Sequence, residues 1–153
     1  MEAILKMYMR RMTVLDNILE GKEQEVQRRQ SGLPLAKLKS RLKDLPPARS
    51  FLASLKDTSK TQIIAEIKKA SPSAGIIRSE FEPIEIAQSY YTGGAAAISV
   101  LTEEDFFQGS IHYLRQVKEA VPLPVLRKDF VIHPYQVYES KYYGADALLL
   151  IAT

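Results

Sequence analysis

After residue 60, short apolar segments alternate with longer segments of helical spacing, and this alternation limits the fold more than any other feature. Strands are expected over 62–68, 96–102, 124–128 and 147–152, with helices over 83–91, 111–121 and 134–143. Strands that alternate with helices of this length form right-handed βαβ units around a parallel sheet. The sequence therefore predicts an α/β fold for residues 61–153.

The junctions after two of the expected helices share one pattern. Residues 90–97 read YYTGGAAA and residues 142–147 read YYGADA, and an aliphatic run follows each. Glycine supplies the left-handed conformation that often ends a helix, and small residues let the chain turn into a buried strand. Repeated junctions of this kind fit a barrel assembled from similar βα modules.

Residues 1–60 have a different character and are expected to form a helical extension. Apolar residues recur at helical spacing over 14–26, and Thr13 or Asp16 is a candidate N-cap for this helix. Two shorter helical segments follow before residue 60. The sequence therefore predicts two parts, a helical segment over 1–60 and an α/β part over 61–153.

Several classes of protein are excluded by composition. The chain has no cysteine, and its two histidines, His112 and His133, lie far apart in the sequence, so no metal site is expected. His112 is interpreted as structural and His133 as an N-cap residue. Charges interrupt the apolar residues of the N-terminus, and the apolar run 145–153 is too short to cross a bilayer. A cytoplasmic location without membrane contact is expected.

Positive charge is concentrated at the N-terminal end. Residues 1–60 carry 13 Lys or Arg and 7 Asp or Glu, whereas the remaining residues carry 8 and 11. A basic segment can bind nucleic acid or acidic lipid. No aromatic-plus-basic RNA-binding motif accompanies it. A solvated helical face is the simpler interpretation, and no nucleic-acid partner is expected.

Charged residues stand at the ends of the first and third expected strands. Glu66 and Lys68 are two residues apart and so share one face of a strand, as do Leu126 and Lys128. In barrels, groups at the carboxyl ends of strands stand in the mouth where active sites form, and alternate strands fill the same layer. Glu66, Lys68 and Lys128 are therefore expected to converge on a catalytic site. A surface salt bridge is the alternative for Glu66 and Lys68.

Other residues near these strand ends carry weaker signals. Arg127 and Asp129 alternate with Lys128 and are expected to face the helices and to pair structurally. Ser71 belongs to a stiff Ser-Pro-Ser loop whose hydroxyls can contact a substrate. Phe107 and Phe130 follow the second and third strands, where they wall an aromatic pocket or belong to the core.

Several motifs, taken in order, resemble the indole-3-glycerol-phosphate synthase family. The matching segments are 64–73 (IAEIKKASPS), 99–103 (SVLTE) with the phenylalanine, glycine and serine that follow, 126–130 (LRKDF), 135–137 (YQV), 144–150 (GADALLL) and, at the N-terminal helix, 13–18 (TVLDNI). The likeness runs from about residue 13 to residue 153. Each motif alone is moderately specific, whereas the ordered set is highly specific.

The resemblance implies a TIM (β/α)8 barrel with an N-terminal helical extension, acting in tryptophan biosynthesis without a metal or an organic cofactor. The implied substrate is a phosphorylated small molecule, 1-(2-carboxyphenylamino)-1-deoxyribulose 5-phosphate. The implied reaction is a decarboxylating ring closure that yields indole-3-glycerol phosphate, CO₂ and water.

The same resemblance implies roles for single residues. Lys128 resembles the general acid that protonates the ribulose carbonyl. Lys68 resembles the lysine that binds the anthranilate carboxylate, and Glu66 the carboxylate that holds both lysines and the substrate hydroxyls. The implied substrate-binding residues are Ser71, Phe107 and Phe130.

Two features depart from the family pattern. Ala74 stands where a lysine is common, which removes an ancillary charge. The 153 residues provide only the first four strands, whereas a TIM barrel takes about 250 residues. The expectation is a barrel truncated to its first half, inactive alone, with exposed strand edges that favour self-association or complementation by a C-terminal half. The sequence leaves open whether Met1 or Met12 is the first residue of the natural protein.

Two other functions stay open at this point. One is another phosphate-binding barrel enzyme, such as phosphoribosylanthranilate isomerase, although the three charged residues at the strand ends disfavour it. The other is a non-enzymatic binding module that uses the basic N-terminal segment, for which basic charge alone is weak support.

Overall fold

A four-stranded parallel sheet forms the centre of the molecule. The computed structural model describes residues 13–152. The strands β1 (Ile64–Ile67), β4 (Ala97–Leu101), β5 (Val125–Lys128) and β6 (Ala147–Leu148) pair in the order in which they occur in the chain. All three pairings are parallel, which confirms the α/β fold with a parallel sheet.

The last strand is shorter than predicted. Residues 147–152 were expected to be extended within the sheet, but β6 ends at Leu148. One further hydrogen bond joins the Leu149 amide to the Arg127 carbonyl at 3.1 Å. The neighbouring strand β5 ends at Lys128, so Leu150 and Ile151 have no strand beside them and are exposed.

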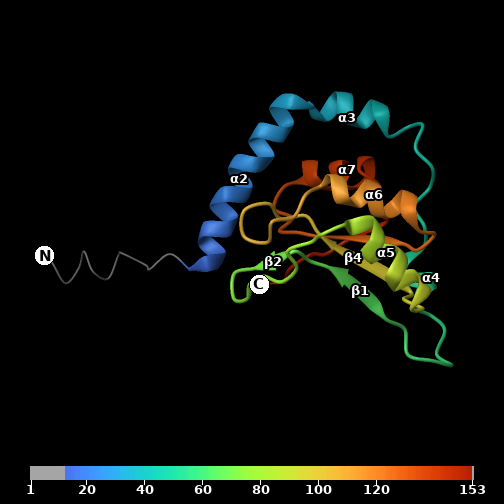
Figure 1. Ribbon diagram of the computed structural model, residues 1–153. Helices are drawn as coiled ribbons and strands as arrows, with labels where there is room; N and C mark the ends of the chain where they lie inside the picture. Colours follow the sequence, from blue (N-terminus) through green and yellow to red (C-terminus); the bar gives the residue numbers. More distant parts are fainter. Residues whose placement is uncertain (1–12, 153) are drawn as a thin grey trace, which may run out of the picture.

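Three helices cover one face of the sheet (Figure 1). They are α5 (Pro83–Thr92), α6 (His112–Ala120) and α7 (Pro134–Tyr142). Between helices and sheet lies an apolar core of buried residues that includes Ile67, Ile98, Val100, Leu114, Val117 and Val125. Gly94 (φ +84°) and Gly144 (φ +99°) adopt the left-handed conformation at the two repeated junctions, as their pattern predicts.

The N-terminal segment consists of α2 (Val14–Gly32), α3 (Leu35–Arg41) and the short α4 (Phe51–Ser54). Thr13 is the N-cap of α2, and its hydroxyl and the Asp16 carboxylate each bind the other residue's backbone amide. A second apolar cluster of Val26, Leu38 and Tyr135 joins this segment to α7. In Figure 1, α2 and α3 wrap around the side of the molecule that carries α6 and α7.

The Ser-Pro-Ser segment is a short hairpin, a more ordered form than the predicted stiff loop. Its strands β2 (Ala70–Ser71) and β3 (Gly75–Ile76) pair in antiparallel fashion. Gly75 adopts a positive φ of 64° at the turn, a conformation that glycine reaches without strain. Within residues 13–152, no helix has both the length and the apolar character needed to cross a bilayer.

Candidate active site

Glu66, Lys68 and Lys128 lie together at the carboxyl ends of the strands. The Lys128 ammonium is 2.6 Å from one Glu66 carboxylate oxygen, and the Lys68 ammonium is 3.1 Å from the other. All three side chains are partly exposed, at 29% for Glu66, 33% for Lys68 and 41% for Lys128. The structure therefore brings together the three residues that the strand pattern predicts will converge.

Strand register explains this contact. Glu66 of β1 pairs with Ser99 of β4, and Lys128 of β5 pairs with Leu101 of β4, two residues further along. Lys128 therefore lies one layer above Glu66 on the same face of the sheet, with β4 between them. Lys68, two residues past Glu66, reaches the same layer as Lys128. One carboxylate thus lies below two ammonium groups and binds both.

The two lysines change the acidity of Glu66. Burial raises the pKa of this carboxyl, but hydrogen bonds and positive charge from Lys128 and Lys68 outweigh that effect and hold the pKa below its ordinary value of 4.5. Glu66 is therefore ionised at neutral pH, and a negative charge lies between two cations.

A cavity of about 400 Å³ lies beside this cluster. Its lining consists of Glu66, Lys68, Ile77, Arg78, Ile86 and Tyr90. The Tyr90 hydroxyl donates a 3.0 Å hydrogen bond to the Glu66 carbonyl and so joins α5 to the end of β1. Arg78 adds a second cation, beside Lys68, to the cavity wall. Arg78 and Tyr90 were not predicted from the sequence, because neither belongs to a strand end.

Ser71 and Phe107 lie in neighbouring loops. The Ser71 hydroxyl accepts a 3.2 Å hydrogen bond from the Ala74 amide and lies 3.5 Å from the Ser73 hydroxyl, so it is part of the hairpin turn. Phe107 is half-buried, and its carbonyl accepts a hydrogen bond from the Ala70 amide at 3.3 Å. The hairpin and the loop after β4 are therefore joined directly.

The loop that carries Phe107 is held by Glu103, a residue that sequence reasoning did not identify. Glu103 is 2% exposed, and its carboxylate accepts hydrogen bonds from the backbone amides of Asp105, Phe106 and Phe107 at 2.7–3.2 Å. Only its place two residues after the end of β4 could have indicated this role.

Phe130 lies against a different hollow. It is half-buried and lines a cavity of about 210 Å³ with Leu15, Leu19, Val131, Ile132 and Ile151. This cavity is formed by the first turns of α2 and the segment after β5, whereas Glu66 and Lys68 line the cavity beside β1. The structure does not place Phe130 in the same cavity as the charged cluster.

A larger hollow of about 560 Å³ lies at the opposite, amino-terminal end of the strands, where the helices end. Its lining includes Arg49, Arg115, Lys118 and Lys141, but each of these cations already donates hydrogen bonds to a neighbouring carbonyl or carboxylate. Lys118, for example, binds Asp146. We therefore assign the candidate site to the carboxyl ends of the strands.

Known proteins match most of this sequence. The family model of indole-3-glycerol phosphate synthase matches residues 15–153. The chain belongs to the indole-3-glycerol phosphate synthase family. It is 56% identical to an indole-3-glycerol phosphate synthase from Rhodopirellula baltica over 141 residues, which are 92% of this chain and 54% of the relative. It is 49% identical to one from Neisseria meningitidis serogroup C over 142 residues, 91% of this chain and 55% of the relative.

The chain thus spans about half the length of the curated relatives it matches.

In this synthase family member, the residues next to Lys128 behave as predicted. Arg127 and Asp129 are both buried on the helix side of the sheet, and an ion pair of 2.9 Å joins them. Their structural pairing is confirmed.

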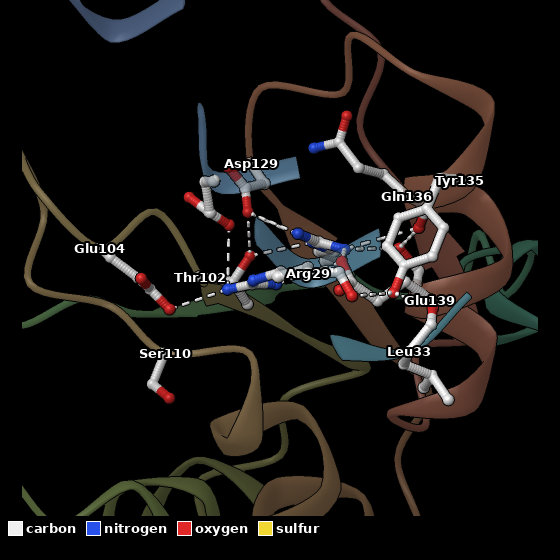
Figure 2. Close-up of polar contacts among 12 residues, drawn as sticks. Arg29, Leu33, Thr102, Glu104, Ser110, Asp129, Tyr135, Gln136 and Glu139 are labelled. Atoms are coloured by element: carbon white, nitrogen blue, oxygen red, sulfur yellow. Dashed lines mark hydrogen bonds and ion pairs between the residues drawn. The ribbon is translucent and has the colours of Figure 1, made fainter. Parts of the chain in front are cut away.

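This pair belongs to a larger network of ion pairs, whose members Arg29, Glu104, Asp129 and Glu139 lie close together in Figure 2. Arg29 of α2 binds Glu104 at 2.8 Å and Glu139 of α7 at 3.1 Å. Arg127 also binds Glu139, at 3.0 Å. The network therefore connects the N-terminal helix, the ends of β4 and β5, and α7.

The two histidines have the structural surroundings expected of them. The His133 ring caps α7 by accepting a hydrogen bond from the Tyr135 amide at 3.1 Å, so the predicted N-cap is confirmed. His112 is the first residue of α6, exposed, and in edge-to-face contact with Tyr143. Over residues 13–152, no group of three or more His, Cys, Asp or Glu is placed to hold a metal ion.

Proposed function

We propose that this chain forms the first half of an indole-3-glycerol-phosphate synthase barrel. The proposed bounds are residues 1–60 for the N-terminal helical extension and residues 61–153 for the first four strands of the TIM (β/α)8 fold with their helices; residues 1–12 and 153 lie outside the described part. The support is a parallel sheet in sequential order with α5, α6 and α7 on one face. A doubly wound open sheet would carry helices on both faces.

The proposed reaction is the family's decarboxylating ring closure. The substrate, 1-(2-carboxyphenylamino)-1-deoxyribulose 5-phosphate, gives indole-3-glycerol phosphate, CO₂ and water. The observation that carries the proposal is the placement of one carboxylate between two ammonium groups, at 2.6 Å and 3.1 Å, at the carboxyl ends of parallel strands. Active sites of barrel enzymes are built at this end.

Each of the three residues has a proposed role. Lys128 donates a proton to the ribulose carbonyl, and its positive charge stabilises the oxygen as the aromatic ring carbon attacks. Lys68 binds the anthranilate carboxylate, which leaves as CO₂ after ring closure. Glu66, ionised at neutral pH, holds both ammonium groups in place.

The remaining proposed site residues surround the substrate. Phe107 and Phe130 contact the anthranilate ring, and Ser71 contacts a polar group of the substrate. Since Phe130 lies in the cavity next to α2, this proposal requires the substrate to extend from the charged cluster towards that helix. No metal or organic cofactor takes part in the proposed reaction, and the cytoplasm is its proposed location.

Complementation tests this function. We expect no turnover from the 153-residue chain alone, because the family's phosphate-binding loops and second catalytic glutamate lie in later strands. Addition of the C-terminal half of the Rhodopirellula baltica relative is expected to restore turnover. Lys128→Met should then lower kcat by about 10²–10⁴-fold, the usual contribution of a general acid.

Lys56→Met is the matched control, because Lys56 is an exposed lysine outside the sheet. It should leave turnover unchanged. Turnover that survives Lys128→Met, or a folded complex of the two halves that converts no substrate, would contradict the proposal.

The basic N-terminal segment does not favour a nucleic-acid-binding function. Lys22 and Arg29 are directed into buried ion pairs, and Arg49 donates hydrogen bonds to the carbonyls of Val121 and Leu123. These cations are therefore not available to phosphates. The isomerase alternative is likewise disfavoured, since the family model and both relatives carry the synthase name.

A further inference from the structure

Lys128, the proposed general acid, stands between two buried charged residues. Arg127 is 0% exposed and Asp129 is 2% exposed, and both point to the helix side of the sheet while Lys128 points to the other side. The direction of the Lys128 side chain depends on the backbone at residues 127–129. Contacts that hold the side chains of Arg127 and Asp129 in place therefore also hold the backbone from which the Lys128 side chain projects.

Four donors fix the Asp129 carboxylate. One oxygen binds the Lys22 ammonium at 2.8 Å and the Phe130 amide at 2.8 Å. The other oxygen binds Arg127 at 2.9 Å and the Thr102 hydroxyl at 2.5 Å. Three of these donors come from the sheet and its strand ends, whereas Lys22 comes from α2, more than one hundred residues earlier in the chain.

Lys22 is an unusual residue to bury. It is 1% exposed, and its ammonium binds Glu25 at 2.6 Å as well as Asp129. Removal of a lysine from water costs free energy that an apolar residue in the same place would not cost. Attachment of α2 to the rest of the molecule can rest on apolar contacts, such as those of Val26 with Leu38 of α3 and Tyr135 of α7. A specific geometric role would account for the buried ammonium.

We infer that Lys22 of the N-terminal helix is a positioning residue for Lys128. Its ammonium completes the set of donors to Asp129, which fixes the end of β5 so that the Lys128 ammonium lies 2.6 Å from Glu66. The helical extension thereby takes part in the geometry of the charged cluster, although over residues 13–60 no hydrogen bond or ion pair joins it to the three cluster residues. This inference rests on the proposed function, because it takes Lys128 as the reacting group.

A purely adhesive role for Lys22 predicts a different result. If Lys22 only attaches α2 to the sheet, its loss lowers the free energy of unfolding and leaves the folded cluster unchanged. If Lys22 positions Lys128, its loss also weakens the contact between Lys128 and Glu66 in molecules that are still folded. The pKa of Glu66 reports on that contact, because Lys128 is one of the two cations that hold it low.

The experiment uses the full 153-residue chain. The variant Lys22→Met/Glu25→Gln removes a buried cation together with its neighbouring carboxylate, so the interior gains no net charge. The Glu66 carboxyl is titrated by ¹³C NMR in this variant and in the parent chain, and circular dichroism verifies folding. We expect the pKa of Glu66 to rise towards 4.5 in the variant.

Arg28→Met is the matched control. Arg28 lies on the same helix in an ion pair with Glu104 in which its side chain is 67% exposed, and none of its recorded contacts involves Asp129. This control should leave the pKa of Glu66 unchanged. Lys22→Arg keeps a cation at this position, so it should raise the pKa of Glu66 less than Lys22→Met/Glu25→Gln does. An unchanged Glu66 pKa in folded Lys22→Met/Glu25→Gln overturns the inference.

If the double variant does not fold, the inference is tested in the opposite direction, by changing Lys128 and observing Lys22. Lys128 is 41% exposed, so Lys128→Met should not endanger folding. Coupling between two sites is reciprocal, so this variant should shift the ¹⁵N resonance of the Lys22 ammonium. No shift overturns the inference. Both readouts are independent of turnover, so failure of the complementation experiment and failure of this inference are distinguishable.

Turnover of the two combined halves provides a third test of the inference. Displacement of a reacting group by about 1 Å can cost on the order of 10²-fold in rate. Lys22→Met/Glu25→Gln should therefore lower kcat about 10- to 100-fold while KM changes little. A loss confined to KM overturns the inference, since Lys22 does not touch the proposed substrate site.

Discussion

At the scale of single residues, strand β5 carries a structural side chain on one face and a proposed catalytic side chain on the other. Along β5, Arg127 is buried among polar partners on the helix side, while Lys128 is directed to the open face. Alternation along a strand makes this separation possible. The convergence of Glu66, Lys68 and Lys128 follows from the same rule. Their assembly was predictable, because residue spacing and strand order are both written in the chain.

The pH dependence of stability tests the Glu66 contact. The folded pKa of Glu66 lies below 4.5, so its stabilising effect is fully present above pH 4.5 and is lost as the pH falls through the folded value. The difference in free energy of unfolding between the parent chain and Glu66→Gln should therefore be about 1 kcal/mol or less near pH 7, since the cluster is partly exposed. It should shrink as the pH falls below 4.5. Urea unfolding across this range provides the measurement, and a difference independent of pH would contradict the expectation.

At the scale of elements, the ends of helices follow local sequence closely. Thr13 caps α2, His133 caps α7, and glycines end α5 and α7, as local signals predict. These contacts join residues no more than a few positions apart, so sequence alone suffices to place them. The hairpin β2–β3 was not anticipated, because its two-residue strands are too short for a recognisable alternation.

The cap of α2 can be tested directly. Thr13 accepts a hydrogen bond from the Asp16 amide at 3.1 Å, and Asp16 binds the Thr13 amide at 2.8 Å. Thr13→Ala should lower the free energy of unfolding by about 1 kcal/mol in urea denaturation. Thr13→Ser keeps the hydroxyl and should stay within about 0.5 kcal/mol of the parent. Equal losses in the two variants would show that the hydroxyl does not stabilise the helix.

At the scale of the whole molecule, the sheet has two edges that no strand within residues 13–152 pairs with. β1 and β6 are the outer strands, and exposed apolar residues lie beside both, including Ile63 (54%), Ile64 (45%) and Leu150 (69%). Unpaired strand edges with apolar residues favour pairing with another chain. The edges are therefore the surfaces through which we propose that the chain self-associates or binds a C-terminal half.

Sedimentation velocity tests this association. The 153-residue chain is expected to form dimers or larger species as its concentration rises. Ile64→Lys places a charge on the β1 edge and should reduce association. Leu52→Lys is the control, because Leu52 is a similarly exposed apolar residue (67%) on α4, outside the sheet. A monomer at every concentration, or equal effects of the two variants, would contradict the role of the edges.

The chain's own residue order was enough to predict the α/β class, the helix ends, the family resemblance and the meeting of Glu66 with the two lysines. Each of these depends on local periodicity, on short-range caps or on the order of parallel strands. Tertiary structure alone decided the contacts of α2 with the sheet. Lys22 and Arg29 looked like a solvated basic face, yet they are buried against Asp129 and Glu139. Partners separated by more than one hundred positions leave no periodic signal, because only the packed fold determines which charges meet.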